Sequence, residues 1–113
     1  MPRKARLQTP DGRYFVARGR LKRCTDPSLD PSTRRACIKA LMQARRAVIH
    51  SGEDRAALAA ALAAVDAAKR RLGERGPVWW TDGAPDEAGA DPATSSYAGW
   101  WAGLDEATRA GGA

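Results

Sequence analysis

The sequence has few of the residues that build metal and catalytic sites. Its 113 residues include one histidine, His50, and two cysteines, Cys24 and Cys37. A structural zinc site needs about four Cys or His ligands, usually in close pairs, so these residues predict no metal site and two free thiols. Catalysis needs several groups that converge, and no specific motif brings them together here. We therefore expect no catalytic residues, no cofactor and no enzymatic activity.

Long apolar runs are also missing. No stretch approaches the roughly 18 consecutive apolar residues of a membrane span. The basic N-terminus is not followed by the apolar segment of a signal peptide. These features predict a soluble, cytoplasmic protein that does not act at a membrane.

Large apolar side chains are scarce as well. The hydrophobic share is 43%, but much of it is alanine, concentrated between Ala56 and Ala68. Alanine favours helix strongly and buries little area per residue. A chain of this length forms one domain, or a small domain with tails. The four tryptophans are therefore expected to contribute much of the core volume.

What the sequence does have is a charge gradient along the chain. Residues 1–50 contain thirteen Lys or Arg and three acids, whereas residues 77–113 contain one and six. The acidic third also holds all four tryptophans, as Trp79-Trp80 and Trp100-Trp101. A basic head and an acidic, Trp-bearing tail indicate contact with a charged partner, or with each other.

Turn chemistry near the N-terminus predicts a β-hairpin or a small meander. Thr9-Pro10-Asp11-Gly12 is typical of a tight turn, and the following residues 13–18 are rich in strand formers. Gly19 is read as a bulge or bend, with the strand continuing over residues 20–24.

The middle of the chain predicts two antiparallel helices. Asp30 and Pro31 are a helix start, and the first helix should run to about His50. A second helix should start near Glu53-Asp54 and end at Gly73. Its apolar stripe places Leu62 and Val65 in the expected core.

The C-terminal third predicts less regular structure. Residues 87–94 are rich in Gly, Ala, Asp and Pro and indicate a flexible linker. Tyr97, Trp100, Trp101 and Leu104 follow at i, i+3, i+4 and i+7, behind Ser95-Ser96 as a cap. This spacing predicts a short amphipathic helix.

Together these patterns predict an α+β fold. A β-hairpin or small meander packs on an antiparallel two-helix hairpin, with a Trp-containing C-terminal extension. The predicted small domain spans residues 1–86 and comprises a basic hairpin (1–24), a helical hairpin (31–73) and a Trp-Trp segment (74–86). Residues 87–113 form the predicted linker and short helix.

One motif carries a resemblance. The segment from Gly73 to Asp86, GERGPVWWTDGAPD, resembles a motif of a family of short uncharacterised proteobacterial proteins. The turn at residues 9–14, the Asp30-Pro31 helix start and the segment 44–48 are similar too. The resemblance implies a bacterial protein. It implies no activity and no site.

The basic N-terminal segment is the candidate functional site. Strict alternation along one long strand would direct Phe15, Ala17, Gly19 and Leu21 to the core, and Tyr14, Val16, Arg18, Arg20 and Lys22 outward. Arginine binds phosphate well and tyrosine stacks on unpaired bases. The predicted nucleic-acid-binding residues are Arg3, Lys4, Arg6, Tyr14, Arg18, Arg20 and Lys22. The alternative is a solvated edge strand, or a basic segment paired with the acidic tail.

The tryptophan pairs offer a second candidate. Trp79, Trp80, Trp100 and Trp101 are of the residue type most enriched where proteins bind one another. The alternative is a lid, in which indoles cover the alanine-rich helices. The sequence thus favours a small binding protein that contacts nucleic acid or another polyanion. The second hypothesis is an adaptor that docks on a protein through its Trp-rich tail.

Overall fold

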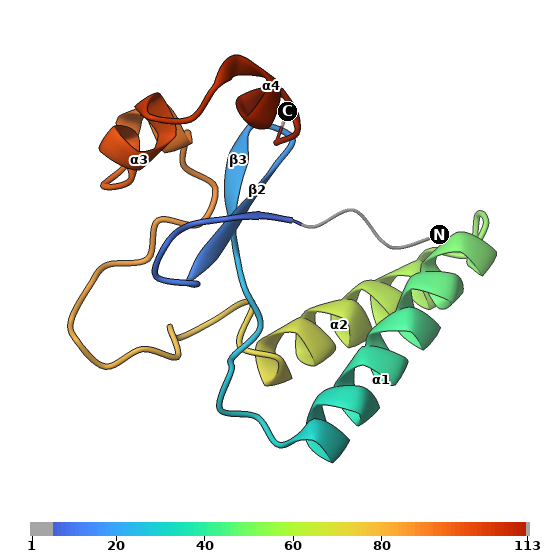
Figure 1. The fold of residues 1–113 in the computed structure, drawn as a ribbon. Helices are drawn as coiled ribbons and strands as arrows, with labels where there is room; N and C mark the ends of the chain where they lie inside the picture. The colour runs from blue at the N-terminus through green and yellow to red at the C-terminus, as the bar shows by residue number, and fades with distance from the viewer. Residues whose placement is uncertain (1–5, 113) are drawn as a thin grey trace. The chain divides into compact units, whose positions relative to one another are not determined.

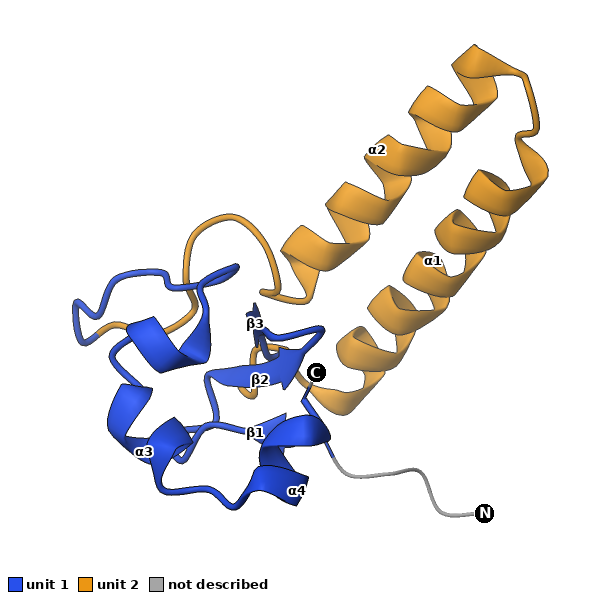
Figure 2. Ribbon diagram, turned by 90° about the horizontal axis from the view of Figure 1, so that it is seen from above, with its two compact units in different colours: residues 1–24, 82–113 blue, residues 25–81 orange. Residues whose placement is uncertain are grey.

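The computed structural model describes residues 6–112 of the chain. It divides into two compact units (Figure 2). Unit 1 combines residues 1–24 with residues 82–113, and unit 2 comprises residues 25–81. The sequence predicted a boundary after residue 86 instead. The difference arises because the acidic C-terminal third forms hydrogen bonds with the N-terminal strands.

Unit 1 is built on a three-stranded antiparallel meander, which confirms the predicted β element (Figure 1). Its strands are β1 (Leu7–Gln8), β2 (Tyr14–Ala17) and β3 (Arg20–Arg23), in that order. The Thr9–Gly12 turn forms as predicted. The backbone N–H of Gly12 donates to the Thr9 carbonyl at 2.9 Å, and that of Arg13 donates to the Asp11 carboxylate at 3.1 Å.

A second tight turn, Arg18-Gly19, separates β2 from β3. Both residues have positive φ, 53° and 73°. Two such residues in succession are typical of the type I′ hairpin turn, whose twist matches that of the flanking strands. The chain therefore reverses at Arg18-Gly19, and the prediction of a bulge or bend at Gly19, with the strand continuing beyond it, was wrong.

The turn decides which side chains share a face of the sheet. Val16 pairs with Leu21 and Tyr14 with Arg23, and all four are buried. Phe15 pairs with Lys22 and Ala17 with Arg20, on the opposite face. The predicted orientation is right for β3, where Leu21 points inward and Arg20 and Lys22 outward. It is wrong for β2, where Tyr14 and Val16 are the buried residues.

The C-terminal segment covers the buried face of this sheet and one of its edges. The Leu21 N–H donates to the Ala90 carbonyl at 2.9 Å, and the Gly89 N–H donates to the Leu21 carbonyl at 2.8 Å. The segment predicted to be a linker thus pairs with the outer edge of β3. It continues through η1 (Pro92–Thr94), α3 (Ala98–Ala102) and α4 (Glu106–Ala110).

Unit 2 contains the predicted helical hairpin. Figures 1 and 2 show α1 (Pro31–His50) and α2 (Arg55–Arg71) side by side and antiparallel. Asp30 caps α1 by accepting from the Thr33 N–H at 2.7 Å, and Asp54 caps α2 in the same way. At the end of α2, Gly73 has φ 78° and donates to the Arg70 carbonyl. A glycine at this position is the usual helix terminator. These findings confirm the predicted helix bounds.

The core between the two helices is small. Its buried residues are Cys37, Leu41, Ala68 and Leu72, with Leu29, Ala40 and Val65 packed against them. Val65 contributes as predicted. Leu62 is 51% exposed, so its predicted place in the core was wrong. The buried row of α2 runs through Ala61 and Ala68, and Leu62 lies about 100° around the helix from Ala61.

Candidate nucleic-acid interface

The outward face of the sheet joins basic residues to an aromatic ring. The strand register places Phe15 between Gln8 of β1 and Lys22 of β3. The Arg6 guanidinium lies over the Phe15 ring, 4.3 Å from its centroid. Arg6, Arg20 and Lys22 are exposed, and Phe15 is half-buried. We call Arg6, Phe15, Arg20 and Lys22 the basic sheet face.

The cations of this face take no part in the ion pairs of the described chain. Those pairs involve Arg13, Arg23, Arg70 and Arg75. The acids of the C-terminal segment bind on the other side of the sheet or at its end, where Asp82 pairs with Arg13 and Asp86 with Arg23. The predicted alternative, a basic segment paired with the acidic tail, therefore applies to Arg13 and Arg23. It does not apply to the basic sheet face.

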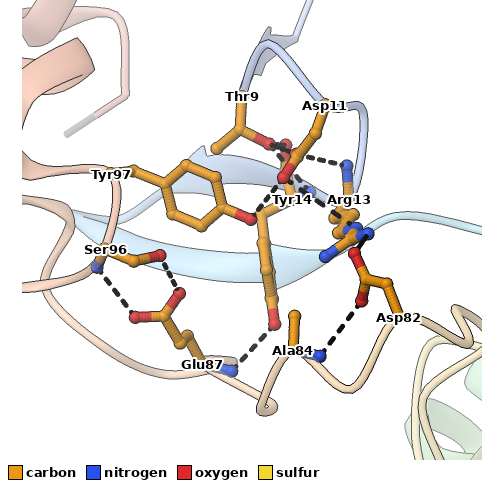
Figure 3. A network of polar contacts seen from close by, with 9 residues as sticks. All are labelled: Thr9, Asp11, Arg13, Tyr14, Asp82, Ala84, Glu87, Ser96 and Tyr97. Atoms are coloured by element: carbon orange, nitrogen blue, oxygen red, sulfur yellow. Dashed lines mark hydrogen bonds and ion pairs between the residues drawn. The ribbon is translucent and has the colours of Figure 1, made fainter.

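Hydrogen bonds hold the C-terminal segment against the buried face (Figure 3). The Tyr97 hydroxyl donates to the Asp11 carboxylate at 2.7 Å, and the Glu87 N–H donates to the Tyr14 hydroxyl at 2.8 Å. The rings of Tyr14 and Tyr97 meet edge to face, with centroids 5.6 Å apart. The Glu87 carboxylate accepts from both the backbone and the hydroxyl of Ser96. One connected network thus joins the first turn to residues 82–97.

The network also sets the charge state of its members. The Arg13 guanidinium, by hydrogen bonding, lowers the pKa of Asp82 below its usual value. Partial burial raises the pKa of Asp11, but hydrogen bonds from Thr9, Tyr97 and Arg13 outweigh it and the net shift is downward. Burial, reinforced by the Asp11 carboxylate, raises the pKa of Tyr97. At neutral pH the two aspartates are therefore anions and Tyr97 is a neutral donor.

The buried end of β3 carries a charged group as well. The Arg23 side chain is buried, and its guanidinium donates to the Asp86 carboxylate at 2.8 Å. A buried cation needs such a partner, because desolvation of an unpaired charge is costly. This pair ties the start of the acidic third to the sheet.

The structure sorts the predicted nucleic-acid-binding residues into several groups. Arg6, Arg20 and Lys22 lie together on the basic sheet face, and Arg18 lies beside it in the hairpin turn. Arg3 and Lys4 lie outside the described residues. Tyr14 is 1% exposed, and its hydroxyl binds Glu87. Its predicted stacking on a base is therefore wrong.

Sequence reasoning missed Phe15, which takes the position predicted for Tyr14. The feature of the sequence that indicates the orientation of Phe15 is the Arg18-Gly19 turn. Had Arg18-Gly19 been read as a two-residue hairpin connection, Leu21 would have faced Val16, and Phe15 would have fallen beside Lys22.

The predicted partner-binding tryptophans occupy two settings. In unit 2, Trp80 is buried at 8% exposure and Trp79 is half-buried, with their rings nearly perpendicular and 5.1 Å apart. In unit 1, Trp100 and Trp101 are half-buried in α3. The N-cap residue is Tyr97 and not Ser95 or Ser96, although the Ser95 hydroxyl accepts from the Tyr97 N–H at 3.1 Å. Burial leaves Trp80 without the accessible ring that a docking residue needs.

The remaining reactive side chains form no site. Cys24 and Cys37 are buried and carry free thiols. Within residues 6–112, no three His, Cys, Asp or Glu side chains are grouped closely enough to hold a metal ion. None of the described helices is both long and apolar enough to cross a membrane.

Comparisons with protein-family models, with curated proteins and with solved structures found nothing that matches this chain. The geometry of the basic sheet face is therefore the basis for a functional proposal.

Proposed function

We propose that the protein binds nucleic acid through its basic sheet face. The observation that carries this proposal is the Phe15 ring, which has Lys22 as its strand partner and the Arg6 guanidinium over it, with Arg20 on the neighbouring strand pair. Arginine and lysine bind phosphate, and an aromatic ring stacks on any base. A base that stacks on the Phe15 face under Arg6 would take the place of the guanidinium, which would then be available to a phosphate. Sheets that bind RNA with aromatic side chains use the same combination.

The arrangement favours a single strand over a duplex. A base can stack on Phe15 only if it is unpaired, since bases within a duplex already stack on their neighbours. Three cations on the face limit the number of phosphate contacts to about three. The slope of log K against log salt on single strands should then be about −2, at roughly −0.7 per contact.

Fluorescence anisotropy with a labelled oligonucleotide tests the proposal directly. A single strand of about 12 nucleotides lies within the range of about 4–16 nucleotides that one OB-fold domain binds. It should be titrated at several salt concentrations, beside a duplex of the same sequence. We expect saturable binding to the single strand that weakens with salt at the slope above.

Two variants separate the basic sheet face from general positive charge. Arg20→Ala with Lys22→Ala should reduce the slope by about 1.4, which corresponds to two phosphate contacts. Arg55→Ala with Arg71→Ala removes the same charge from exposed positions in unit 2 and should leave affinity nearly unchanged.

A third variant tests stacking. Phe15→Leu retains an apolar side chain but removes the ring, and should weaken single-strand binding by about 1–3 kcal/mol. Duplex binding should change little. If both double variants weaken binding equally and Phe15→Leu has no effect, attraction is due to net charge alone and the proposal is wrong.

A further inference from the structure

The helical hairpin carries an apolar stripe that its own core does not use. Four large apolar side chains of unit 2 are exposed: Ile38 at 36%, Met42 at 44%, Ile49 at 77% and Leu62 at 51%. Ile38, Met42 and Ile49 are separated by four and then seven residues, so they fall on one side of α1. Single exposed apolar residues are ordinary on protein surfaces, but a row of them indicates a contact surface.

Leu62 lies on the same side of the hairpin, on α2, with Arg45 between it and the apolar row of α1. A shallow groove lined by Ala40, Gln43, Ala64 and Ala67 marks one side of the hairpin. At about 100° per residue, Ile38, Met42 and Ile49 lie on the other side of the buried row of α1. Leu62 lies on the corresponding side of the buried row of α2. We call these four residues the hairpin stripe.

Arginines flank the stripe on both sides. Arg34 and Arg45 follow one margin of it along α1, and Arg35 and Arg46 follow the other, by the same helical spacing. The sequence of α1 contains five Lys or Arg residues and no acid. All four of these arginines are exposed. On α1 the surface therefore combines a row of apolar side chains with arginines along both of its margins.

We infer that the hairpin stripe is the docking site for an acidic amphipathic helix of a partner protein. A helix that packs across this side of the hairpin, along the apolar row of α1, would complete a three-helix arrangement of the kind seen in bundles. Its apolar residues would cover the stripe and its acids would face the arginines. This is the helix-in-groove mode of recognition, with charge complementarity that directs the encounter.

Other occupants fit these observations less well. A second copy of the chain would place the arginines of one α1 against those of the other. Nucleic acid would satisfy the arginines but leave the central apolar side chains without a partner. A lipid surface favours a wide apolar face with aromatic residues, whereas four aliphatic side chains form a narrow row.

The test uses the full chain and a synthetic peptide probe. The probe is an acetylated and amidated helix of about 18 residues, with leucines at i, i+3, i+4 and i+7 and glutamates on both flanks. Two control peptides have lysine in place of glutamate, or the same composition in scrambled order. Titration calorimetry should detect binding of the acidic helix and at least tenfold weaker binding of both controls.

Variants on the protein locate the site. The double variant Met42→Gln/Ile49→Gln should bind the acidic peptide at least tenfold more weakly than the wild type. The double variant Arg45→Ala/Arg46→Ala should show a loss of the same size. Ala47→Ser, at an exposed position of the same helix away from the stripe, should change nothing. Circular dichroism checks that each variant is folded. The oligonucleotide affinity of Met42→Gln with Ile49→Gln should equal that of the wild type, so the two binding surfaces can fail independently.

Several results would overturn the inference. If the ordered and scrambled acidic peptides bind equally, binding depends on the arginines alone and the apolar residues of the stripe have no role. If the protein sediments with phosphatidylcholine–phosphatidylserine vesicles and does not bind the peptide, the hairpin stripe contacts lipid and the inference is wrong. Self-association that Met42→Gln with Ile49→Gln abolishes would make it a dimer interface. Loss of folding in that variant would make it an internal contact.

Discussion

At the scale of single residues, Asp11 links the first turn to the C-terminal segment. Its carboxylate accepts from Thr9, from the Arg13 N–H and from the Tyr97 hydroxyl. The folded-state pKa values of Asp11 and Asp82 both lie below the ordinary 3.8. The unfolded state therefore binds more protons than the folded state just below that pH. The contribution of these two aspartates to the stability of unit 1 is therefore present above about pH 3.8 and is lost as pH falls through their folded-state pKa values.

Replacement of this carboxylate should reduce that pH dependence. Asp11→Asn should lower the stability of unit 1 at pH 7 by about 1 kcal/mol, because a hydrogen bond to a half-exposed charge is lost. Its stability should also change less between pH 5 and pH 3 than that of the wild type. Urea titrations followed by the NMR amide signals of Val16 and Leu21 measure both effects. Glu106→Gln, an exposed acid in α4, is the control. An equally steep acid dependence in Asp11→Asn would contradict the role of Asp11.

At the scale of elements, the ends of α1 and α2 are set by side chains that the sequence already indicates. Asp30 accepts hydrogen bonds from the backbone N–H and the hydroxyl of Thr33 and from the hydroxyl of Ser32. Asp30→Ala should destabilise unit 2 by about 1 kcal/mol, whereas Asp30→Asn should retain most of the capping. Thermal unfolding monitored by helical circular dichroism compares the two. Equal melting temperatures would show that the cap contributes nothing measurable.

The same element allows a direct test of which apolar residues form the core. Leu72 is fully buried in the hairpin, and Leu62 is exposed. Leu72→Ala should cost about 2–5 kcal/mol, because it leaves a cavity in a small core. Leu62→Ala makes the same chemical change and should cost less than about 0.5 kcal/mol. Urea denaturation of the two variants gives the comparison. If Leu62→Ala lowers the free energy of unfolding as much as Leu72→Ala does, Leu62 packs against other residues and is not exposed.

At the scale of the whole molecule, the charge gradient along the sequence is largely balanced within unit 1. Residues 1–24 and 82–113 together contain nine Lys or Arg and seven Asp or Glu. Unit 2 contains ten and six, and five of its cations lie in α1. The excess positive charge of the protein therefore belongs mainly to the helical hairpin. In unit 1 the acids Asp82 and Asp86 pair with Arg13 and Arg23, whereas Arg6, Arg20 and Lys22 lie on the basic sheet face.

Removal of residues 87–113, which belong to unit 1, should therefore disrupt the fold of unit 1 and leave unit 2 folded. A chain that stops after Asp86 lacks the strand-like pairing of Gly89 and Ala90 with Leu21 and the contact of the Tyr97 ring with Tyr14. We expect the NMR signals of residues 6–24 to lose their dispersion while those of α1 and α2 persist. If the signals of the strands remain dispersed, the C-terminal segment contributes little to the stability of the sheet.

Local chemistry explains how much of this fold could be predicted. Both helices, the Asp30 and Asp54 caps and the first turn follow from residues that are neighbours in sequence. The faces of β2 could not be resolved in the same way, because Tyr14/Val16 and Phe15/Ala17 are both plausible buried pairs. The choice between them depends on pairing with β3 and on coverage by a segment about 75 residues later. The sequence therefore predicted the cations of the basic sheet face, Arg6, Arg20 and Lys22, but not its aromatic residue, Phe15.

Two connections of the fold should respond differently to inserted residues. The Arg18-Gly19 turn is sensitive to a change in length, and the connection at Gly52 tolerates one. Side chains alternate along a strand, so one residue added to this turn, if the strand bonds shift to accommodate it, would exchange the two sides of β3. Lys22 would be directed into the interior and Leu21 into water. The connection between α1 and α2 carries no such constraint, since extra residues at Gly52 would lengthen an exposed loop. Related chains that differ in length should therefore vary at Gly52 and keep two residues between β2 and β3.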